Sequence, residues 1–191
     1  MKSSIVYIIN TLKKYGINLQ TNIEDEPQQI ENTAKAEKIL SVYQNHTGYK
    51  LTIANLGIKY SGNSPLVFNS RLETIKKKPR WTELFRNNRM LVPMSGFYEW
   101  KKEGSQKIPY RIFIPGEELF FVGALYNLDN DNNFFSALIT TTPNSFIKPL
   151  HNRMPVIFKI PDGIKFLNSD SNSALDMCIP FQGDMQMEKV Q

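Results

Sequence analysis

One carboxylate in this sequence lies inside a run of strand-forming aromatic residues. Glu99 is flanked by Tyr98 and Trp100 and preceded by Phe97, all within residues 89–102. Aromatic side chains favour strands. A carboxyl group held among rings loses hydration, which raises its pKa and suits it to exchanging protons near neutral pH. The alternative is an exposed glutamate on an edge strand, because strands alternate their faces, and the residues alone leave both interpretations open.

Two further segments carry polar side chains that could assist proton transfer. Asn69 opens the run Asn-Ser-Arg-Leu-Glu-Thr at residues 69–74, and His151 opens the run His-Asn-Arg-Met-Pro at residues 151–155. A histidine is apt for proton transfer, and an asparagine amide can orient an amine or a sugar oxygen. A lone histidine is more often structural, so residue type alone does not assign its role.

Together these three segments resemble the SOS response-associated peptidase (SRAP) family. The family pattern has an Asn-Ala-Arg-Ala-Glu-Thr block, a Gly-Phe-Tyr-Glu-Trp block and a His-Asp-Arg-Met-Pro block, and matching blocks occur here in that order. The resemblance spans about residues 52–157. It implies a protein of the DNA-damage response that binds single-stranded DNA at abasic sites, with Asn69, Glu99 and His151 as the catalytic residues.

The resemblance also implies a covalent chemistry for which this chain lacks one group. In the family, a cysteine directly after the initiator Met attacks the aldehyde of the abasic site and forms a stable thiazolidine crosslink; the peptidase name reflects a proposed activity, best seen as removal of residues ahead of that cysteine. Here Lys2 occupies that position, and the single cysteine is Cys178. Without a thiol beside the amine the thiazolidine ring cannot close, so we expect non-covalent binding or a transient Schiff base through Met1 or Lys2. Leu56 stands where the family has a base-stacking tryptophan, which removes one stacking surface.

Three functions therefore compete. The first is a divergent SRAP enzyme, and the second is a catalytically inactive module that binds single-stranded DNA. The third is a peptidase or other hydrolase with Ser95 as nucleophile, although no Gly-x-Ser-x-Gly context surrounds this serine. Borohydride distinguishes the first two, because reduction traps a Schiff base.

Arginine side chains supply candidate contacts to DNA phosphates. The net charge is +5, which permits a polyanionic partner. Arg71, Arg80 and Arg153 are the candidates, because guanidinium groups clamp phosphate oxygens with paired hydrogen bonds. Arg71 or Arg153 could instead be a structural ion-pair partner, with Glu73 or Asp162 available. The local excess of positive charge comes from Lys76, Lys77, Lys78, Arg80, Arg86 and Arg89.

Aromatic side chains supply candidate contacts to bases. Trp100, Phe97 and Trp81 could each stack on an unpaired base, an interaction worth about 1 to 3 kcal/mol. Packing in the core is the alternative for each ring.

Composition limits the remaining possibilities. We expect one domain over residues 1–191. A single cysteine excludes an internal disulfide and favours a reducing compartment. Two histidines and one cysteine cannot form a standard zinc site without several carboxylates, so we expect no metal and no cofactor. The N-terminal apolar run is interrupted by polar residues and no segment is long enough to span a membrane, so we expect a cytoplasmic monomer.

The hydrophobic pattern predicts an α+β fold with a mainly antiparallel, curled or barrel-like sheet and a few peripheral helices. Helical spacing of Ile5, Ile8, Ile9 and Leu12 predicts a helix over residues 4–15. Residues 21–33 read as a loop, and Trp81, Leu84 and Phe85 are expected to face inward from a helix. Strands are expected at residues 39–43, 49–56, 66–69, 108–114, 119–125, 134–141 and 156–158, and helices from 70 through 74, at 82–88 and at 174–178. From residue 89 the chain returns to strands, with irregular backbone at Pro93 and Gly96.

Overall fold

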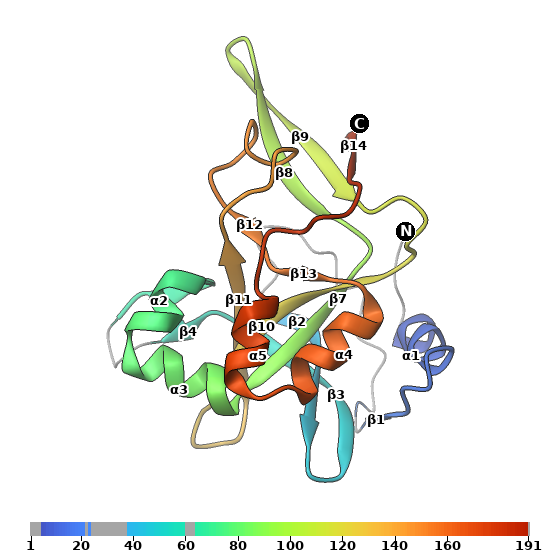
Figure 1. The fold of residues 1–191 in the computed structure, drawn as a ribbon, viewed down its shortest axis with the longest axis vertical. Helices are drawn as coiled ribbons and strands as arrows, with labels where there is room; N and C mark the ends of the chain where they lie inside the picture. Colours follow the sequence, from blue (N-terminus) through green and yellow to red (C-terminus); the bar gives the residue numbers. More distant parts are fainter. Residues whose placement is uncertain (1–4, 22, 24–37, 60–63, 191) are drawn as a thin grey trace.

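Five strands close into a ring at the centre of the molecule (Figure 1). The computed structural model describes residues 5–21, 23, 38–59 and 64–190. Each strand pairs with the next, and a parallel pairing of the last with the first completes the ring. In order around it they are β3 (Gly48–Leu56), β2 (Lys38–Asn45), β7 (Arg89–Met94), β10 (Phe120–Leu128) and β11 (Phe134–Thr141).

Shorter strands and helices surround this ring. β6 pairs in parallel with β11, and β12 pairs with β11 in the antiparallel sense. No helix of the described residues is long and apolar enough to cross a membrane. The peripheral elements are α1 (Ile5–Lys13), β1 (Leu19–Thr21), β4 (Ile58–Lys59), β5 (Leu66–Val67), β6 (Asn69–Arg71), α2 (Leu72–Lys77), α3 (Pro79–Asn87), β12 (Met154–Pro155), β13 (Ile157–Phe158), α4 (Ile160–Asn168) and α5 (Ser171–Met177).

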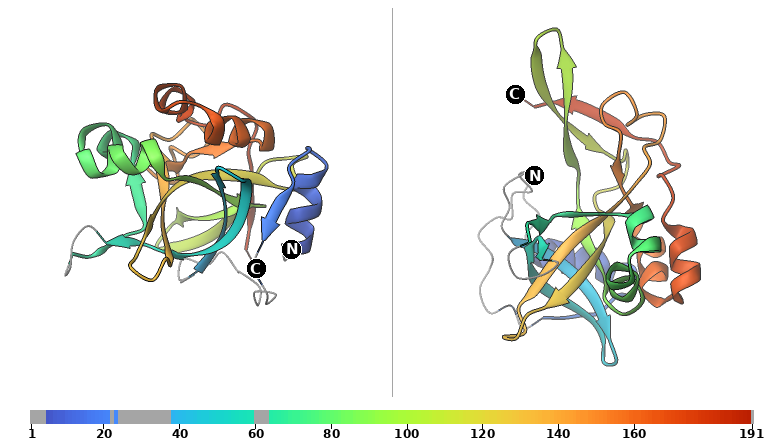
Figure 2. Two further views of the ribbon diagram at one scale, coloured as in Figure 1. Left: turned by 90° about the horizontal axis from the view of Figure 1, so that it is seen from below. Right: turned by 90° about the vertical axis from the view of Figure 1, so that its left-hand side faces the viewer.

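A second sheet of three strands projects from one end of the ring (Figure 2). It contains β14 (Gln186–Lys189), β9 (Gln106–Phe113) and β8 (Phe97–Glu103), in that order. β8 follows β7 after two residues, so this sheet is a continuation of the ring's own chain. The hairpin places the aromatic run around Glu99 outside the ring wall.

Close packing fixes α4 against the ring. A Cβ atom at Gly163 would lie 2.5 Å from Cδ2 of Phe121, a ring buried on β10. Only glycine allows this approach. Arg89 closes the same region, because its guanidinium donates to the carbonyl oxygens of Phe85 and Leu167 at 3.0 and 3.3 Å. Arg89 therefore joins α3, β7 and α4 and does not add to the outer basic surface as expected.

The α+β class and the curled, ring-like sheet are confirmed. The pairing is less uniformly antiparallel than expected, because three pairings of the ring sheet are parallel. The expected loop at 21–33 lies mostly outside the described residues. Helix α4 and strand β14 were not predicted. Strands resume at residue 89 as expected, and β7 and β8 are separated at Ser95 and Gly96, where irregular backbone was expected at Gly96.

Candidate active site at the edge of the ring

Glu99 and His151 come together although 51 residues separate them in sequence. Glu99 lies on β8, and His151 lies in the segment that leads into β12. His151 Nδ1 is 3.7 Å from Glu99 Oε1, which is longer than a hydrogen bond but close enough for an electrostatic interaction when the imidazole is protonated. The pair can exchange protons with a molecule bound beside it.

Partial burial tunes Glu99. Its side chain is 19% exposed, and this loss of hydration raises the pKa of the carboxyl. The nearby His151 and a hydrogen bond from the backbone N–H of Trp100 favour the charged form, but they offset burial only in part. Of the two interpretations of Glu99, the structure supports the partly buried carboxyl.

A backbone carbonyl orients the ring of His151. Nδ1 lies 3.0 Å from the carbonyl oxygen of Arg153. A carbonyl oxygen only accepts, so Nδ1 carries the proton in this contact. Nε2 then remains for a bound molecule, and the side chain is 51% exposed, which leaves the ring accessible.

Arg153 is held by three hydrogen bonds. Its Nη1 and Nη2 atoms donate to the two carboxylate oxygens of Glu73 at 3.0 and 2.9 Å, and Nη2 also donates to the carbonyl of Thr140 at 2.8 Å. The side chain is only 16% exposed. Of the two roles considered for Arg153, the structure shows the ion pair with Glu73; phosphate contact stays a prediction.

Strand β11 brings two further candidates to this edge. Thr140 of β11 lies opposite Arg71 of β6 on one side and Pro155 of β12 on the other. Arg71 and Asn69 are both exposed. The topology places β6 and β12 on opposite sides of one strand, but among the described residues no hydrogen bond joins Asn69 to Glu99 or His151. Convergence of all three catalytic candidates stays a prediction.

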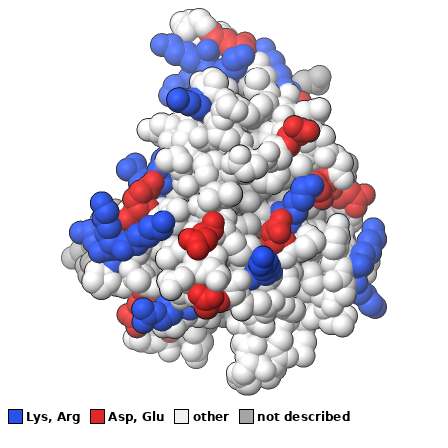
Figure 3. Space-filling view, viewed as in Figure 1, with Lys and Arg blue, Asp and Glu red and all other residues white. Residues whose placement is uncertain are grey.

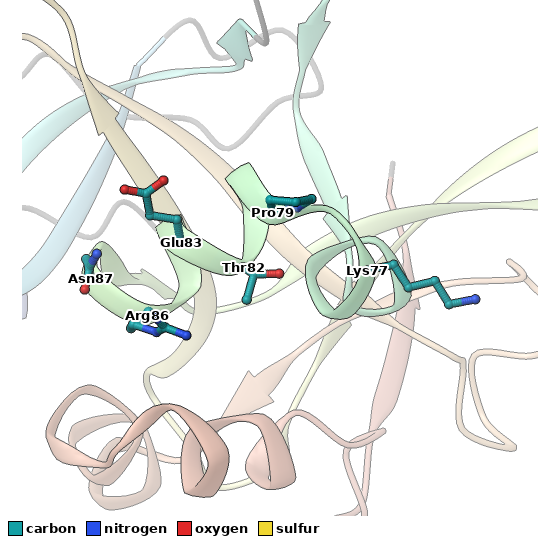
Figure 4. Close-up of a pocket in the computed structure, with 6 residues that line it drawn as sticks. All are labelled: Lys77, Pro79, Thr82, Glu83, Arg86 and Asn87. Carbon is teal, nitrogen blue, oxygen red and sulfur yellow. The ribbon is translucent and has the colours of Figure 1, made fainter.

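Two hollows lined by cationic side chains lie on the surface next to Arg153 and over α2 and α3. One, of about 310 Å³, is lined by Arg71, Glu73, Thr74, Lys77, Lys78 and Arg153. The other, of about 510 Å³, is lined by Lys77, Pro79, Thr82, Glu83, Arg86 and Asn87 (Figure 4). Lys77 lines both, so the two hollows are neighbours on this surface. Figure 3 shows Lys and Arg gathered over α2 and α3 and again near the end of the β8–β9 hairpin.

The third arginine candidate lies beside these hollows. Arg80 is half-buried on α3, and its Nη2 donates to the carbonyl of Lys59 at 2.8 Å. This bond ties α3 to β4. A role in phosphate contact stays a prediction for Arg80.

The three aromatic candidates have different environments. Trp81 is only 5% exposed and faces inward from its helix as expected, so of its two alternatives the structure supports core packing and not stacking. Phe97 is half-buried against the apolar cluster that includes Ile112 and Met94. Trp100 is 45% exposed, and its neighbour Tyr98, which the sequence did not single out, is 40% exposed.

The described residues offer no alternative nucleophile in a reactive setting. Burial raises the pKa of the Cys178 thiol to about 12, and its Sγ donates to the carbonyl of Ala174 at 3.3 Å. Within the described part of the chain, the Ser95 hydroxyl makes no hydrogen bond to a histidine or carboxylate, as a nucleophilic serine would need. No group of three or more His, Cys, Asp or Glu side chains there could hold a metal, and no residue set suggests a cofactor.

Comparison with solved structures defines the class of protein first. A crystal structure of a protein from Bacteroides thetaiotaomicron matches with a TM-score of 0.78 and 24% identity, over 96% of this chain and 88% of that chain. Another, from Bordetella bronchiseptica, matches with a TM-score of 0.74 and 13% identity, over 96% and 95%. These likenesses show a shared strand-rich α+β fold, on which this chain carries a Glu–His pair at the ring edge.

Sequence comparison then identifies the family. The chain belongs to the SOS response associated peptidase (SRAP) family, whose model matches residues 7–191. It is 30% identical to the abasic site processing protein YoaM of Bacillus subtilis over 172 residues, which cover 83% of this chain and 76% of that protein. It is 22% identical to the abasic site processing protein YedK of Escherichia coli over 129 residues, 62% of this chain and 57% of that protein. The resemblance in the three sequence blocks is confirmed.

Proposed function

We propose that this protein binds single-stranded DNA at abasic sites and that Glu99 and His151 face the aldehyde of the lesion. The observation that carries the proposal is the 3.7 Å approach of His151 Nδ1 to Glu99 Oε1. Arg153, whose carbonyl contacts the same imidazole, also lines a hollow with Arg71, Lys77 and Lys78. Relatives over most of the chain are named abasic site processing proteins. Asn69 is the third proposed catalytic residue, because its strand adjoins the same edge.

The proton transfers required by a Schiff base match these side chains. The abasic sugar must open to its aldehyde. An amine then adds to the aldehyde carbon and one proton passes from the nitrogen to the oxygen, which gives a hydroxyl group. A second proton converts this hydroxyl to water, which leaves as the C=N bond forms, and the nitrogen then loses its remaining proton. Each step moves one proton, and a partly buried carboxyl beside an imidazole is suited to supply and accept it. The amines expected to react, those of Met1 and Lys2, lie outside the described residues.

The cationic side chains are proposed to hold the backbone of the same strand. Arg71 is exposed in the smaller hollow, while Arg153 lies deeper in it and is paired with Glu73. Arg80 extends the set along α3. A phosphate approaching Arg153 would compete with the Glu73 carboxylate, so we expect Arg71 to contribute more to affinity.

Fluorescence anisotropy with matched oligonucleotides tests the proposal. A labelled single strand with one abasic site should bind more tightly than the same strand without the lesion and than a blunt duplex. His151→Ala and Glu99→Gln should remove most of the preference for the lesion, whereas Lys165→Ala, which removes an exposed charge from α4, should not. Equal affinity of the parent for all three DNAs would refute the proposal.

Borohydride separates the enzymatic form of this function from simple binding. A covalent adduct that forms only with reductant and abasic DNA supports a transient Schiff base. Binding without any adduct supports the inactive single-stranded DNA-binding module. The hydrolase alternative rests on Ser95 alone, and Ser95→Ala should leave DNA binding unchanged.

A further inference from the structure

The β8–β9–β14 sheet carries an aromatic face on the side opposite Glu99. Burial alternates along β8, with Phe97, Glu99 and Lys101 less exposed than the residues between them. Tyr98 and Trp100 therefore share the other face, 40% and 45% exposed. Successive residues of one face are about 7 Å apart along a strand, so the two rings form one continuous surface.

Neighbouring strands add apolar and cationic groups to this aromatic face. Trp100 lies opposite Pro109, whose carbonyl accepts a hydrogen bond from the Val190 backbone at 3.1 Å. Lys102 lies opposite Lys107 in the same register, and both are exposed. Neither lysine forms an ion pair within the described residues, so two positive charges adjoin the rings.

The third cation of the face is already neutralised. Arg111 lies opposite Tyr98, and its Nη1 donates to the Glu188 carboxylate at 2.9 Å. Its Nη2 donates to the carbonyl of Ser95 at 2.7 Å. Arg111 therefore holds β14 and the start of β8 in place, while Lys102 and Lys107 are the charges that a ligand would meet.

We propose that the Tyr98–Trp100 face stacks the unpaired bases that flank the lesion, while Lys102 and Lys107 contact their phosphates. This inference rests on the proposed function and extends it to the flanking nucleotides. Aromatic rings beside a cationic track are the usual means of holding single-stranded nucleic acid. Since Glu99 points to the other side of β8, the DNA strand must pass over the free edge of β8 between the lesion and the stacked bases.

The charge on this face favours DNA over a protein partner or a second copy of the chain. Lysine is depleted in protein–protein interface cores. Two lysines without acidic partners would repel their equivalents in a symmetric dimer that used the same face. A paired duplex would also fit poorly, because its bases are already stacked on each other.

Intrinsic fluorescence tests stacking directly, since the two tryptophans differ in exposure. Trp81 is 5% exposed and Trp100 is 45% exposed, so a quencher reaches mainly Trp100. An unpaired oligothymidylate, with or without an abasic site, should quench the emission while anisotropy reports binding. Trp100→Ala should abolish the quenching and weaken binding by about 5- to 150-fold. Trp100→Phe should abolish the quenching and retain most of the affinity.

A matched tyrosine separates stacking from general loss of an aromatic residue. Tyr98→Ala should weaken binding, whereas Tyr15→Ala, which removes a 49% exposed ring beyond the end of α1, should not. DNA binding with no quenching, and unaffected by Trp100→Ala and Tyr98→Ala, would overturn the inference while the proposed function stands. Self-association in sedimentation that Trp100→Ala abolishes would assign the face to a second copy and overturn it too.

The proposed function fails in a distinguishable way. If the parent is quenched equally well by damaged and undamaged single strands, with equal affinities, the stacking face is supported and the preference for abasic sites is refuted. If no oligonucleotide binds in the anisotropy measurement, both the proposed function and the stacking face are refuted.

Discussion

Glu99 and Glu73 are two carboxylates of one site whose surroundings shift their pKa values in opposite directions. Burial raises the pKa of Glu99, whereas two hydrogen bonds from Arg153 lower that of Glu73. As the pH falls, Glu99 therefore takes up a proton at a higher pH than Glu73 does. This difference supports the proposal that Glu99, and not Glu73, exchanges protons with the bound molecule.

Glu99→Gln should stabilise the protein at neutral pH. A raised pKa means that the fold disfavours the charged carboxylate, and this cost is fully present above the folded-state pKa. As the pH falls toward the unfolded value of about 4.3, the folded protein takes up the proton first and the cost disappears. Urea unfolding from pH 8 to pH 4 should show the variant more stable at the upper end, with the difference vanishing at the lower end. A variant less stable than the parent at pH 8 would contradict this account.

Glu73→Gln should have the opposite pH dependence. A lowered pKa stabilises the fold above the unfolded pKa of about 4.3, and this contribution is lost as the pH falls through the folded-state pKa. Because the Glu73 side chain is 52% exposed, we expect a loss of at most about 1 kcal/mol at pH 7. The same urea series, extended to pH 3, measures it. A loss that persists unchanged at pH 3 would show that the ion pair is not its cause.

At the scale of elements, the pattern of apolar residues and turns predicted the strands of the ring well. Helix α4 and the exposure of the aromatic side chains depend instead on tertiary packing. The β2–β3 hairpin and β11 have long apolar runs and clear turns, so their positions follow from the sequence. Helix α4 was missed because Gly163 is a poor helix former; this glycine is required by contact with Phe121, which no local pattern reveals. Likewise, aromatic content alone could not show that Trp81 is buried and Trp100 exposed.

The turn at Gly96 sets where β8 begins. A Cβ atom there would lie 2.8 Å from the carbonyl oxygen of Ile112 and 2.9 Å from Nε of Arg111. Gly96→Ala should therefore push β8 away from β9, destabilise the fold by about 1 to 3 kcal/mol and weaken the Glu99–His151 contact. Denaturant unfolding measures the first effect, and the chemical shifts of the His151 ring measure the second. Ser95→Ala is the control, and a Gly96→Ala protein with parental stability and His151 shifts would refute this role.

At the scale of the whole molecule, the fold brings Glu99 and His151 from distant segments to one edge of the ring. The sequence blocks named Glu99, His151 and Asn69. The approach of His151 to Glu99 depends on the pairing of β11 with β12 and on the direction of β8, and the proposed convergence of Asn69 depends on the pairing of β11 with β6. Such long-range pairing is not encoded in any local window. The family pattern could therefore identify the candidate site, but the contact between Arg153 and Glu73 was only one of two alternatives until the fold was known.

The two neighbouring hollows lined by cationic side chains predict salt-dependent binding of single-stranded DNA. Each phosphate neutralised by the protein makes the slope of log affinity against log salt more negative by about 0.7. Arg71→Ala and Lys77→Ala should each weaken binding and make this slope less steep by about 0.7, the value for one phosphate contact, because these exposed side chains line the hollows. Anisotropy titrations between 50 and 200 mM salt, about the range over which such effects are large, measure both. Lys165→Ala is the matched control, and a slope unchanged by the hollow variants would place the DNA elsewhere.

The most direct test of the central claim is the difference in affinity between an abasic single strand and its intact counterpart, measured for the parent and for His151→Ala. The parent should prefer the abasic strand, and the variant should bind both strands with the affinity that the parent has for the intact one. A His151→Ala protein that folds normally and keeps the full preference would contradict the assignment of the Glu99–His151 pair to the lesion.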